Sequence, residues 1–168
     1  MNFKNTEKLL NQKFADNDFD SYCVFVYAKG YERFIHSPNV NADTYFDIAS
    51  MGKVLVTSPL ILKAIGENKL SLDDTLAHFF DNTPKDKAFI TIKQLLTHTS
   101  GIRRYDIPQE IADKGNDKVA NFILHTSLAF EPGKSQEYSC NGMILLGYII
   151  EKIYGKTLEE VFDEKIKT

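Results

Sequence analysis

A serine and a lysine stand three residues apart in Phe-Asp-Ile-Ala-Ser-Met-Gly-Lys, residues Phe46–Lys53 of the chain. Residues at this spacing share one face of a helix, so Lys53 can bring its amine to the hydroxyl of Ser50. A serine hydroxyl is a weak nucleophile until a base removes its proton. Burial would lower the pKa of the Lys53 amine and leave it neutral, so we expect Lys53 to be able to act as that base. The backbone N–H of Ser50, at the positive end of the predicted helix, would stabilise an oxyanion.

The Ser-x-x-Lys pattern alone also fits a serine that caps a helix, followed by a solvent-exposed lysine. Two segments further along the chain favour the chemical interpretation. The first is Leu-Leu-Thr-His-Thr-Ser-Gly-Ile, residues Leu95–Ile102. The second is Tyr-Ser-Cys-Asn-Gly-Met-Ile-Leu-Leu-Gly, residues Tyr138–Gly147, which follows a Glu-Pro-Gly turn sequence at residues 131–133.

In order and spacing, these motifs resemble those of the serine β-lactamase and penicillin-binding-protein superfamily, in particular its class C-like branch of esterases and D-peptidases. The resemblance extends from about Phe46 to Glu160. It implies that Ser50 is the acylated nucleophile and that Lys53 is its partner. It also implies that Tyr138, the tyrosine of the family's Tyr-x-Asn motif, shuttles the serine proton, with the Lys53 cation easing ionisation of the phenol.

The third position of that Tyr-x-Asn motif departs from the family, because it holds Cys140 in place of asparagine. Asn141 comes one residue too late to fill it. A thiol cannot offer the donor and acceptor of an amide to a substrate amide. We therefore expect Cys140 at the substrate-binding position, with a larger effect on β-lactam recognition than on acyl transfer. The resemblance implies no metal and no organic cofactor.

Three other interpretations of single residues are weaker. His98 could form a triad with Ser50, but no orienting carboxylate is evident, and the resemblance implies that its segment is a structural helix end. Cys140 could be a nucleophile, but it has no basic partner in a recognisable local pattern, so a buried thiol is expected. Asp73 and Asp74 could bind a metal, but no other ligand residues cluster with them, so a solvated turn is expected.

Periodicity and turn residues predict an α+β chain, and the resemblance implies a β-lactamase/transpeptidase-like arrangement. Residues 1–48 are expected to hold a helix at 2–17 and a β-hairpin at 22–27 and 31–37, which form part of an incomplete antiparallel sheet. Residues 49–168 are expected to be a helical region that carries the motifs. Its helices are predicted at 51–67 with a kink or break at Pro59, from Thr91 to a left-handed cap at Gly101, at 117–127, at 141–154, and after Thr157.

The family's third motif, Lys-Thr-Gly or His-x-Gly on a later strand, does not follow Tyr138 in this sequence. The resemblance places the second oxyanion N–H on that strand, and further strands would complete the sheet. We therefore expect the chain to be the N-terminal portion of the fold. Such a chain would be weakly active alone and would tend to self-associate through the unpaired edge of its sheet.

Composition narrows the function further. The chain has 168 residues, with 20 Lys and Arg against 23 Asp and Glu, and this slight acidic excess argues against a general nucleic-acid binder. Its longest apolar stretches, around residues 54–65 and 143–150, are too short to span a bilayer. The N-terminus shows no secretory signal, and Cys23 and Cys140 form no disulfide framework, so a cytoplasmic location is expected unless a signal has been removed.

The function that the resemblance implies is hydrolysis or transfer of an acyl group through a Ser50 acyl-enzyme. Its partner would be a small ester or amide, including D-amino-acid peptides or β-lactams. The alternative is a non-catalytic fragment or binding module of the same fold, which would recognise peptides or a partner protein through its strand edge.

Overall fold

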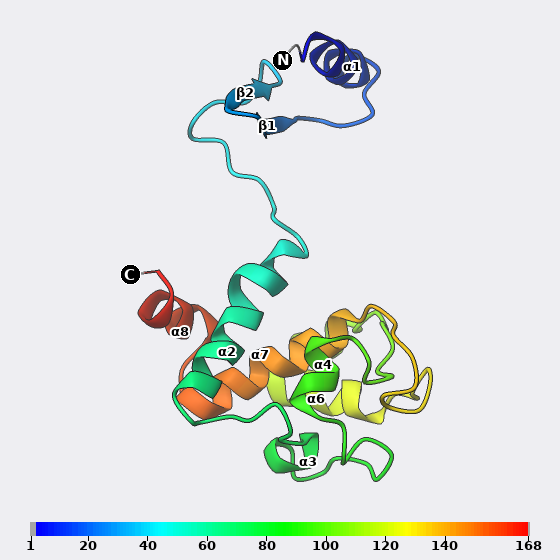
Figure 1. Cartoon of the computed structure of the whole chain (residues 1–168). Coiled ribbons are helices and arrows are strands. Elements are labelled where there is room, and N and C mark those ends of the chain that lie inside the picture. The colour runs from blue at the N-terminus through cyan, green and yellow to red at the C-terminus, as the bar shows by residue number, and fades with distance from the viewer. Residues whose placement is uncertain (1–2, 168) are drawn as a thin grey trace. The chain divides into compact units, whose positions relative to one another are not determined.

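The structure is a computed structural model that describes residues 3–167 of the chain. The chain divides into two compact units, Met1–Asp47 and Ile48–Thr168, which we describe separately (Figure 1). Within residues 3–167, no helix is both long and apolar enough to cross a membrane.

The first unit contains helix α1 (Lys4–Ala15) and the antiparallel strands β1 (Cys23–Ala28) and β2 (Tyr31–His36). The two strands pair from Cys23 opposite His36 to Ala28 opposite Tyr31. Lys29 and Gly30, the two residues between them, have φ of 50° and 80°. Positive φ at both central residues is the geometry that two-residue hairpin turns require. The helix and the hairpin therefore form where the sequence predicts them, and the predicted helix residue 2 lies outside the described part.

Tyr22 holds the helix of this unit to its hairpin. The Tyr22 hydroxyl donates to Asn11 Oδ1 of α1 at 2.6 Å, and the rings of Phe14 and Phe19 lie edge-on to the Tyr22 ring at 6.1 and 5.7 Å. A second aromatic pair lies on the hairpin itself, where Phe25 and Phe34 face each other across the two strands. This pair is not covered, since the two residues are 60% and 56% exposed. Among the described residues no third strand joins these two, so the predicted incomplete sheet is confirmed.

The second unit is helical. Its elements are the π-helical turn η1 (Lys53–Thr57), α2 (Ser58–Gly66), α3 (Leu76–Phe79), α4 (Ile92–Leu96), α5 (Gln109–Ala112), α6 (Asn116–His125), α7 (Cys140–Tyr154) and α8 (Leu158–Lys165). Helix α7, orange in Figure 1, contacts α2, α4, α6 and α8. It buries Leu145, Leu146, Ile149 and Ile150 completely, which explains why its sequence is apolar over most of its length. Helix α7 is therefore the centre of the core.

Pro59 shapes the helix that carries the Ser-x-x-Lys pattern. A proline ring clashes with the carbonyl four residues earlier in a regular α-helix and cannot donate a backbone hydrogen bond. The turn before Pro59 is wider than an α-helical turn, because the Ser58 N–H donates to the carbonyl of Lys53, five residues back. Pro59 then lies in the first turn of α2, where a proline is tolerated. The predicted irregularity is confirmed, but it precedes Pro59 and includes Lys53.

Local capping patterns set several helix ends. The predicted capping boxes are present at Thr91 with Gln94 and at Thr157 with Glu160. The predicted end of the helix after Thr91 is wrong, because α4 stops at Leu96 and the left-handed residue that follows it is His98, with φ of 57°. The short helices α3 and α5 were not predicted, since single turns carry too little periodicity.

Gly101 is left-handed as well, with φ of 75°, but it serves a close backbone approach and not a helix cap. A Cβ atom at this position would lie 2.2 Å from the carbonyl oxygen of Phe130. The Gly101 carbonyl also accepts a 2.8 Å hydrogen bond from the Ala129 N–H. Only glycine satisfies both the conformation and the contact.

Gly101→Ala is therefore expected to destabilise the protein by roughly 3 kcal/mol or more, from left-handed strain plus the clash with Phe130. For a domain of this size the melting temperature should fall by roughly 6–12 °C. The matched control is Gly66→Ala, because a Cβ there meets no atom within 4 Å. Thermal unfolding followed by circular dichroism checks both, and equal melting temperatures for the two variants would contradict this account of Gly101.

Candidate active site

Ser50 lies at the start of the helix that runs through η1 into α2. The Lys53 N–H donates to the Ser50 carbonyl at 3.1 Å, so the first helical turn begins at the serine. The residue before it, Ala49, has φ of 44°, a left-handed conformation that is strained for alanine. Strain of this kind is frequent at functional sites. The Ser50 side chain itself is exposed.

Two side chains converge on the Ser50 hydroxyl. Lys53 Nζ donates to Ser50 Oγ at 3.1 Å, and the Tyr138 hydroxyl donates to the same oxygen at 2.6 Å. Lys53 Nζ also lies 5.3 Å from the centre of the Tyr138 ring. The structure thus brings together all three residues predicted to act in the chemistry, although Tyr138 is 88 residues from Ser50 in the sequence.

The charge state of Lys53 corrects one expectation. The pKa of Lys53 is raised above its ordinary value, mainly through hydrogen bonding with the Tyr138 phenol and with smaller contributions from Cys140. Burial acts in the opposite direction, but the side chain is only half-buried and the effect is outweighed. The raised pKa therefore disagrees with a neutral Lys53 base and agrees with the Lys53 cation that the resemblance implies.

Backbone hydrogen bonds hold the segment that carries Tyr138. The Gly133 N–H donates to the Thr99 carbonyl at 2.8 Å, and the Glu137 N–H donates to the His98 carbonyl at 3.0 Å. With the Ala129–Gly101 bond, these contacts join residues 97–101 to residues 129–139, and we call this arrangement the clasp. The Leu-Leu-Thr-His-Thr-Ser-Gly motif therefore ends in a turn onto which the Tyr138 segment docks.

His98 lies in the clasp beside Tyr138. Its ring centroid is 4.7 Å from that of Tyr138, with 50° between the planes, and its Nδ1 accepts the Ser139 N–H at 3.3 Å. The pKa of His98 is lowered by burial and, to a smaller extent, by the nearby Lys53 charge. Among the described residues it bonds neither Ser50 nor a carboxylate, so nothing supports a triad. Its contact with Tyr138 could not be read from the sequence.

Cys140 and Asn141 point to different surroundings. Cys140 is the first residue of α7 and lines a pocket next to Lys53. The Asn141 amide is buried and donates to the carbonyls of Arg103 and Tyr105 at 3.1 and 3.2 Å. Asn141 thus supports the loop after Ile102, whereas Cys140 lines the same pocket as Lys53.

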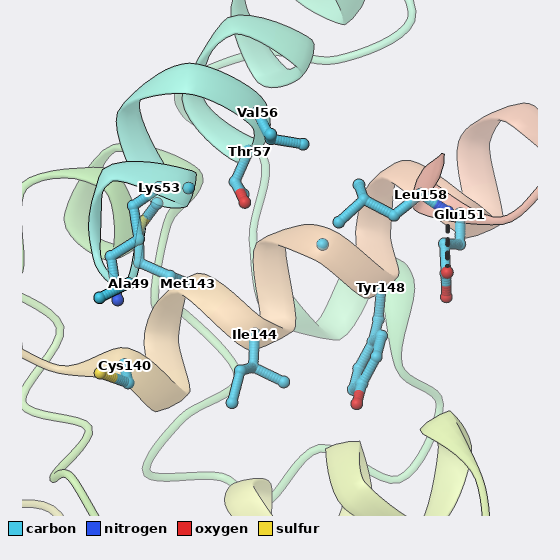
Figure 2. Close-up of a pocket in the computed structure, with 12 residues that line it drawn as sticks. Ala49, Lys53, Val56, Thr57, Cys140, Met143, Ile144, Tyr148, Glu151 and Leu158 are labelled. Atoms are coloured by element: carbon cyan, nitrogen blue, oxygen red, sulfur yellow. Dashed lines mark hydrogen bonds between the residues drawn. The ribbon is translucent and has the colours of Figure 1, made fainter. Parts of the chain in front are cut away.

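The pocket next to Lys53 has a volume of about 520 Å³ and lies between η1 and α7 (Figure 2). Apolar side chains form most of its wall, namely Val56, Met143, Ile144 and Leu158, and Lys53 and Cys140 line it as well. Glu151 also borders it, but one of its carboxylate oxygens accepts the Leu158 N–H at 3.0 Å and the other accepts the Asn116 amide. The space next to Lys53 and Cys140 therefore suits an apolar group.

Nothing in residues 3–167 gathers three or more metal-binding side chains. The Asp73–Asp74 pair belongs to a turn, in which an Asp74 carboxylate oxygen accepts the Ser71 N–H at 2.7 Å. This local hydrogen bond gives Asp74 a role within the turn.

Known proteins resemble the chain over most of its length. A protein of Dichelobacter nodosus named for fimbrial assembly, FimD of serogroup D, is 39% identical over 132 residues, which are 74% of this chain and 33% of that protein. A protein of Escherichia coli (strain K12) named as a D-alanyl-D-alanine carboxypeptidase is 29% identical over 136 residues, which are 73% of this chain and 31% of that protein. The chain therefore spans about a third of the length of these curated relatives.

The fold has a close counterpart among solved structures. The crystal structure of a D-amino acid amidase from Ochrobactrum anthropi SV3 matches with a TM-score of 0.77 at 24% identity, over 95% of this chain and 47% of that one. The sequence model of the Beta-lactamase family matches residues 7–167. The motifs, the fold and this match together show that the chain belongs to the β-lactamase family.

Proposed function

We propose that this chain carries the acylation site of a serine hydrolase that acts on small esters or amides. The observation that carries the proposal is the convergence of Lys53 Nζ and the Tyr138 hydroxyl on Ser50 Oγ, at 3.1 and 2.6 Å. A cation and a phenol directed at one exposed hydroxyl can lower the free energy of removing its proton. A serine that merely caps the helix would need neither partner.

In the proposed reaction the Tyr138 phenol first gives its own proton to solvent, and Lys53 remains an ammonium ion that stabilises the resulting phenolate. The phenolate takes the Ser50 proton while Oγ bonds to the substrate carbonyl carbon, whose π electrons move to the carbonyl oxygen. Tyr138 then gives this proton to the leaving oxygen or nitrogen as its bond to the carbon breaks. Water hydrolyses the resulting ester by the same route, because Tyr138 takes a proton from water and returns it to Ser50.

The Ser50 N–H is the proposed oxyanion donor on this side of the site, since it makes no backbone hydrogen bond within residues 3–167. The family's second donor belongs to a strand whose Lys-Thr-Gly or His-x-Gly tripeptide does not follow Tyr138. Loss of one such donor slows catalysis by about 100- to 1,000-fold, so the donor at Ser50 is expected to contribute strongly to the proposed reaction.

The proposed substrate has an apolar acyl group. The pocket that begins at Lys53 and Cys140 would accept such a group next to the ester bond formed at Ser50. The relatives named for D-alanyl-D-alanine and D-amino-acid substrates make a D-amino-acid amide or peptide one member of this class.

The two unpaired thiols, Cys23 and Cys140, support a reducing and hence cytoplasmic environment.

A second candidate function is that of an interaction module. The exposed Phe25–Phe34 pair favours it, as do the edges of the hairpin, which no other strand of residues 3–167 joins. Such edges pair with other strands, including those of a second copy. The two candidates differ in one respect that can be measured directly, since only the hydrolase has a reactive Ser50.

A fluorophosphonate probe is expected to form a covalent adduct on Ser50, because its hydroxyl is exposed and faces both Lys53 and Tyr138. Intact-mass spectrometry followed by peptide mapping locates the adduct. Ser50→Ala should abolish labelling, and Ser135→Ala, at an exposed serine in the Tyr138 segment, should leave it unchanged. An adduct elsewhere, or none on the folded native chain, would contradict the proposal and favour the interaction module.

Lys53 and Tyr138 are expected to act as one proton-transfer unit. Lys53→Ala and Tyr138→Phe should each slow probe labelling by about 100-fold or more, and the double variant should be little worse than either, because members of one unit are not additive. Matched controls are Lys63→Ala and Tyr45→Phe, at exposed positions. Labelling rates that fall additively would mean that the two residues act independently.

Cys140 is expected to bias the site toward esters. The native chain should hydrolyse a nitrophenyl ester better than a chromogenic cephalosporin, and Cys140→Asn should shift the ratio of their kcat/KM values toward the cephalosporin by about 5-fold or more, the effect of one restored hydrogen bond. Cys140→Ser is the control, since it changes polarity without supplying an amide. If the native chain prefers the cephalosporin, this account of Cys140 fails.

A further inference from the structure

His98 holds the chain on both sides of Tyr138. Its carbonyl accepts the Glu137 N–H at 3.0 Å, its Nδ1 accepts the Ser139 N–H at 3.3 Å, and its ring lies 4.7 Å from the ring of the residue between them. We infer that His98 is a positioning residue that fixes Tyr138 against Ser50. The inference rests on the proposed hydrolase function.

The need for such a residue follows from the position of Tyr138. The tyrosine is 46% exposed and stands just before α7, so no helix holds its backbone. Its hydroxyl nevertheless lies 2.6 Å from Ser50 Oγ, a distance that requires the ring to be well oriented. Misplacement of a proton-transfer group by about 1 Å can slow a reaction by about 100-fold. The two hydrogen bonds of His98 hold the backbone on both sides of Tyr138, and this backbone placement orients the Tyr138 ring.

The backbone of His98 separates this role from an ordinary helix end. His98 follows the C-cap Thr97 with φ of 57°, and the His98 and Thr99 N–H groups bond back to the carbonyls of Leu95 and Gln94. Glycine or asparagine usually occupies this left-handed position, because other side chains are strained there. A glycine would complete the helix end equally well, so the imidazole contributes through the hydrogen bond that its Nδ1 accepts from the Ser139 N–H.

These contacts fix the protonation state of the ring. Because Nδ1 accepts a hydrogen bond from the Ser139 N–H, the ring must be neutral with its proton on Nε2. A second proton, on Nδ1, would face the N–H group and break the bond. The charged group that opposes this protonation from η1 is Lys53, and Tyr138 is the titratable group that faces the ring from the segment before α7.

The pH dependence follows from these neighbours. Burial and the Lys53 charge place the pKa of His98 below the ordinary 6.5, so the bond to Ser139 is intact at neutral pH. The unfolded chain binds the proton more readily than the folded one, so the positioning of Tyr138 is complete above pH 6.5 and is lost as the pH falls through the lowered pKa.

The test compares two variants that both tolerate the left-handed backbone. His98→Asn keeps an acceptor at the position of Nδ1, and His98→Gly removes it. We expect His98→Asn to label with the fluorophosphonate probe within about threefold of the native rate, and His98→Gly to label about tenfold more slowly or worse. Both should melt near the native temperature. The acid decline in labelling that follows protonation of His98 should be absent in His98→Asn.

Two results would overturn the inference: native-like labelling by His98→Gly, or an equal loss in both folded variants. Nitrogen-15 NMR of the imidazole tests the same contact without any activity. It should find the proton on Nε2 at neutral pH, and the Ser139 amide signal should shift on acidification together with His98. A proton on Nδ1 would contradict the inference even if the chain never labels, whereas absence of labelling alone would count against the proposed function.

Discussion

The clasp between residues 97–101 and residues 129–139 is the constraint on which the active site depends. Ser50 and Lys53 share one helical turn, so local geometry brings them together. Tyr138 reaches them only because its segment is docked by backbone hydrogen bonds, at Gly101, Thr99 and His98. Each such bond contributes about 1 kcal/mol, so the docking of Tyr138 rests on several modest and cooperative contacts. The left-handed Gly101 permits the close approach that begins this docking.

Helix α7 connects this clasp to the core. Ser139 caps the helix, since its hydroxyl accepts the Gly142 N–H at 3.3 Å, and α7 then buries its apolar face against α2, α4, α6 and α8. The residue before the cap, Tyr138, therefore stands between a rigid helix and a docked loop. Lys53 meets it from a π-helical turn that Pro59 favours. Rigid elements thus approach Ser50 from two parts of the sequence, which favours a preorganised site.

Much of this arrangement could be predicted from the sequence. Capping boxes, the two-residue hairpin turn and the long apolar helix are local signals, and they appeared where the residues placed them. The pairing of Ser50 with Lys53 followed from helical spacing, and Tyr138 followed from its motif. The resemblance implied a Lys53 cation, but the Ser-x-x-Lys spacing alone could not predict that charge, because the pKa of Lys53 depends on how deeply the side chain is buried and on the phenol that reaches it from a distant segment.

The contacts of His98 and Asn141 could not be predicted from the sequence either, since both side chains bond to backbone groups far away in the chain. The early end of α4 was missed for a related reason. Glycine is the usual left-handed residue after a helix, so the sequence predicted the end of this helix at Gly101. In the structure His98 is the left-handed residue that follows α4. Tertiary contacts explain both cases, because the clasp stabilises a histidine where the local sequence favours glycine.

The most direct test of the central claim is native-state hydrogen exchange at the amides of Ala129, Gly133 and Glu137, which donate the backbone bonds of the clasp. If the clasp is part of the cooperative fold, these amides should exchange with opening free energies close to that of Leu146 in the buried face of α7. If they exchange like an unstructured loop while Leu146 stays protected, the clasp opens independently, and the placement of Tyr138 on Ser50 that we describe would be contradicted.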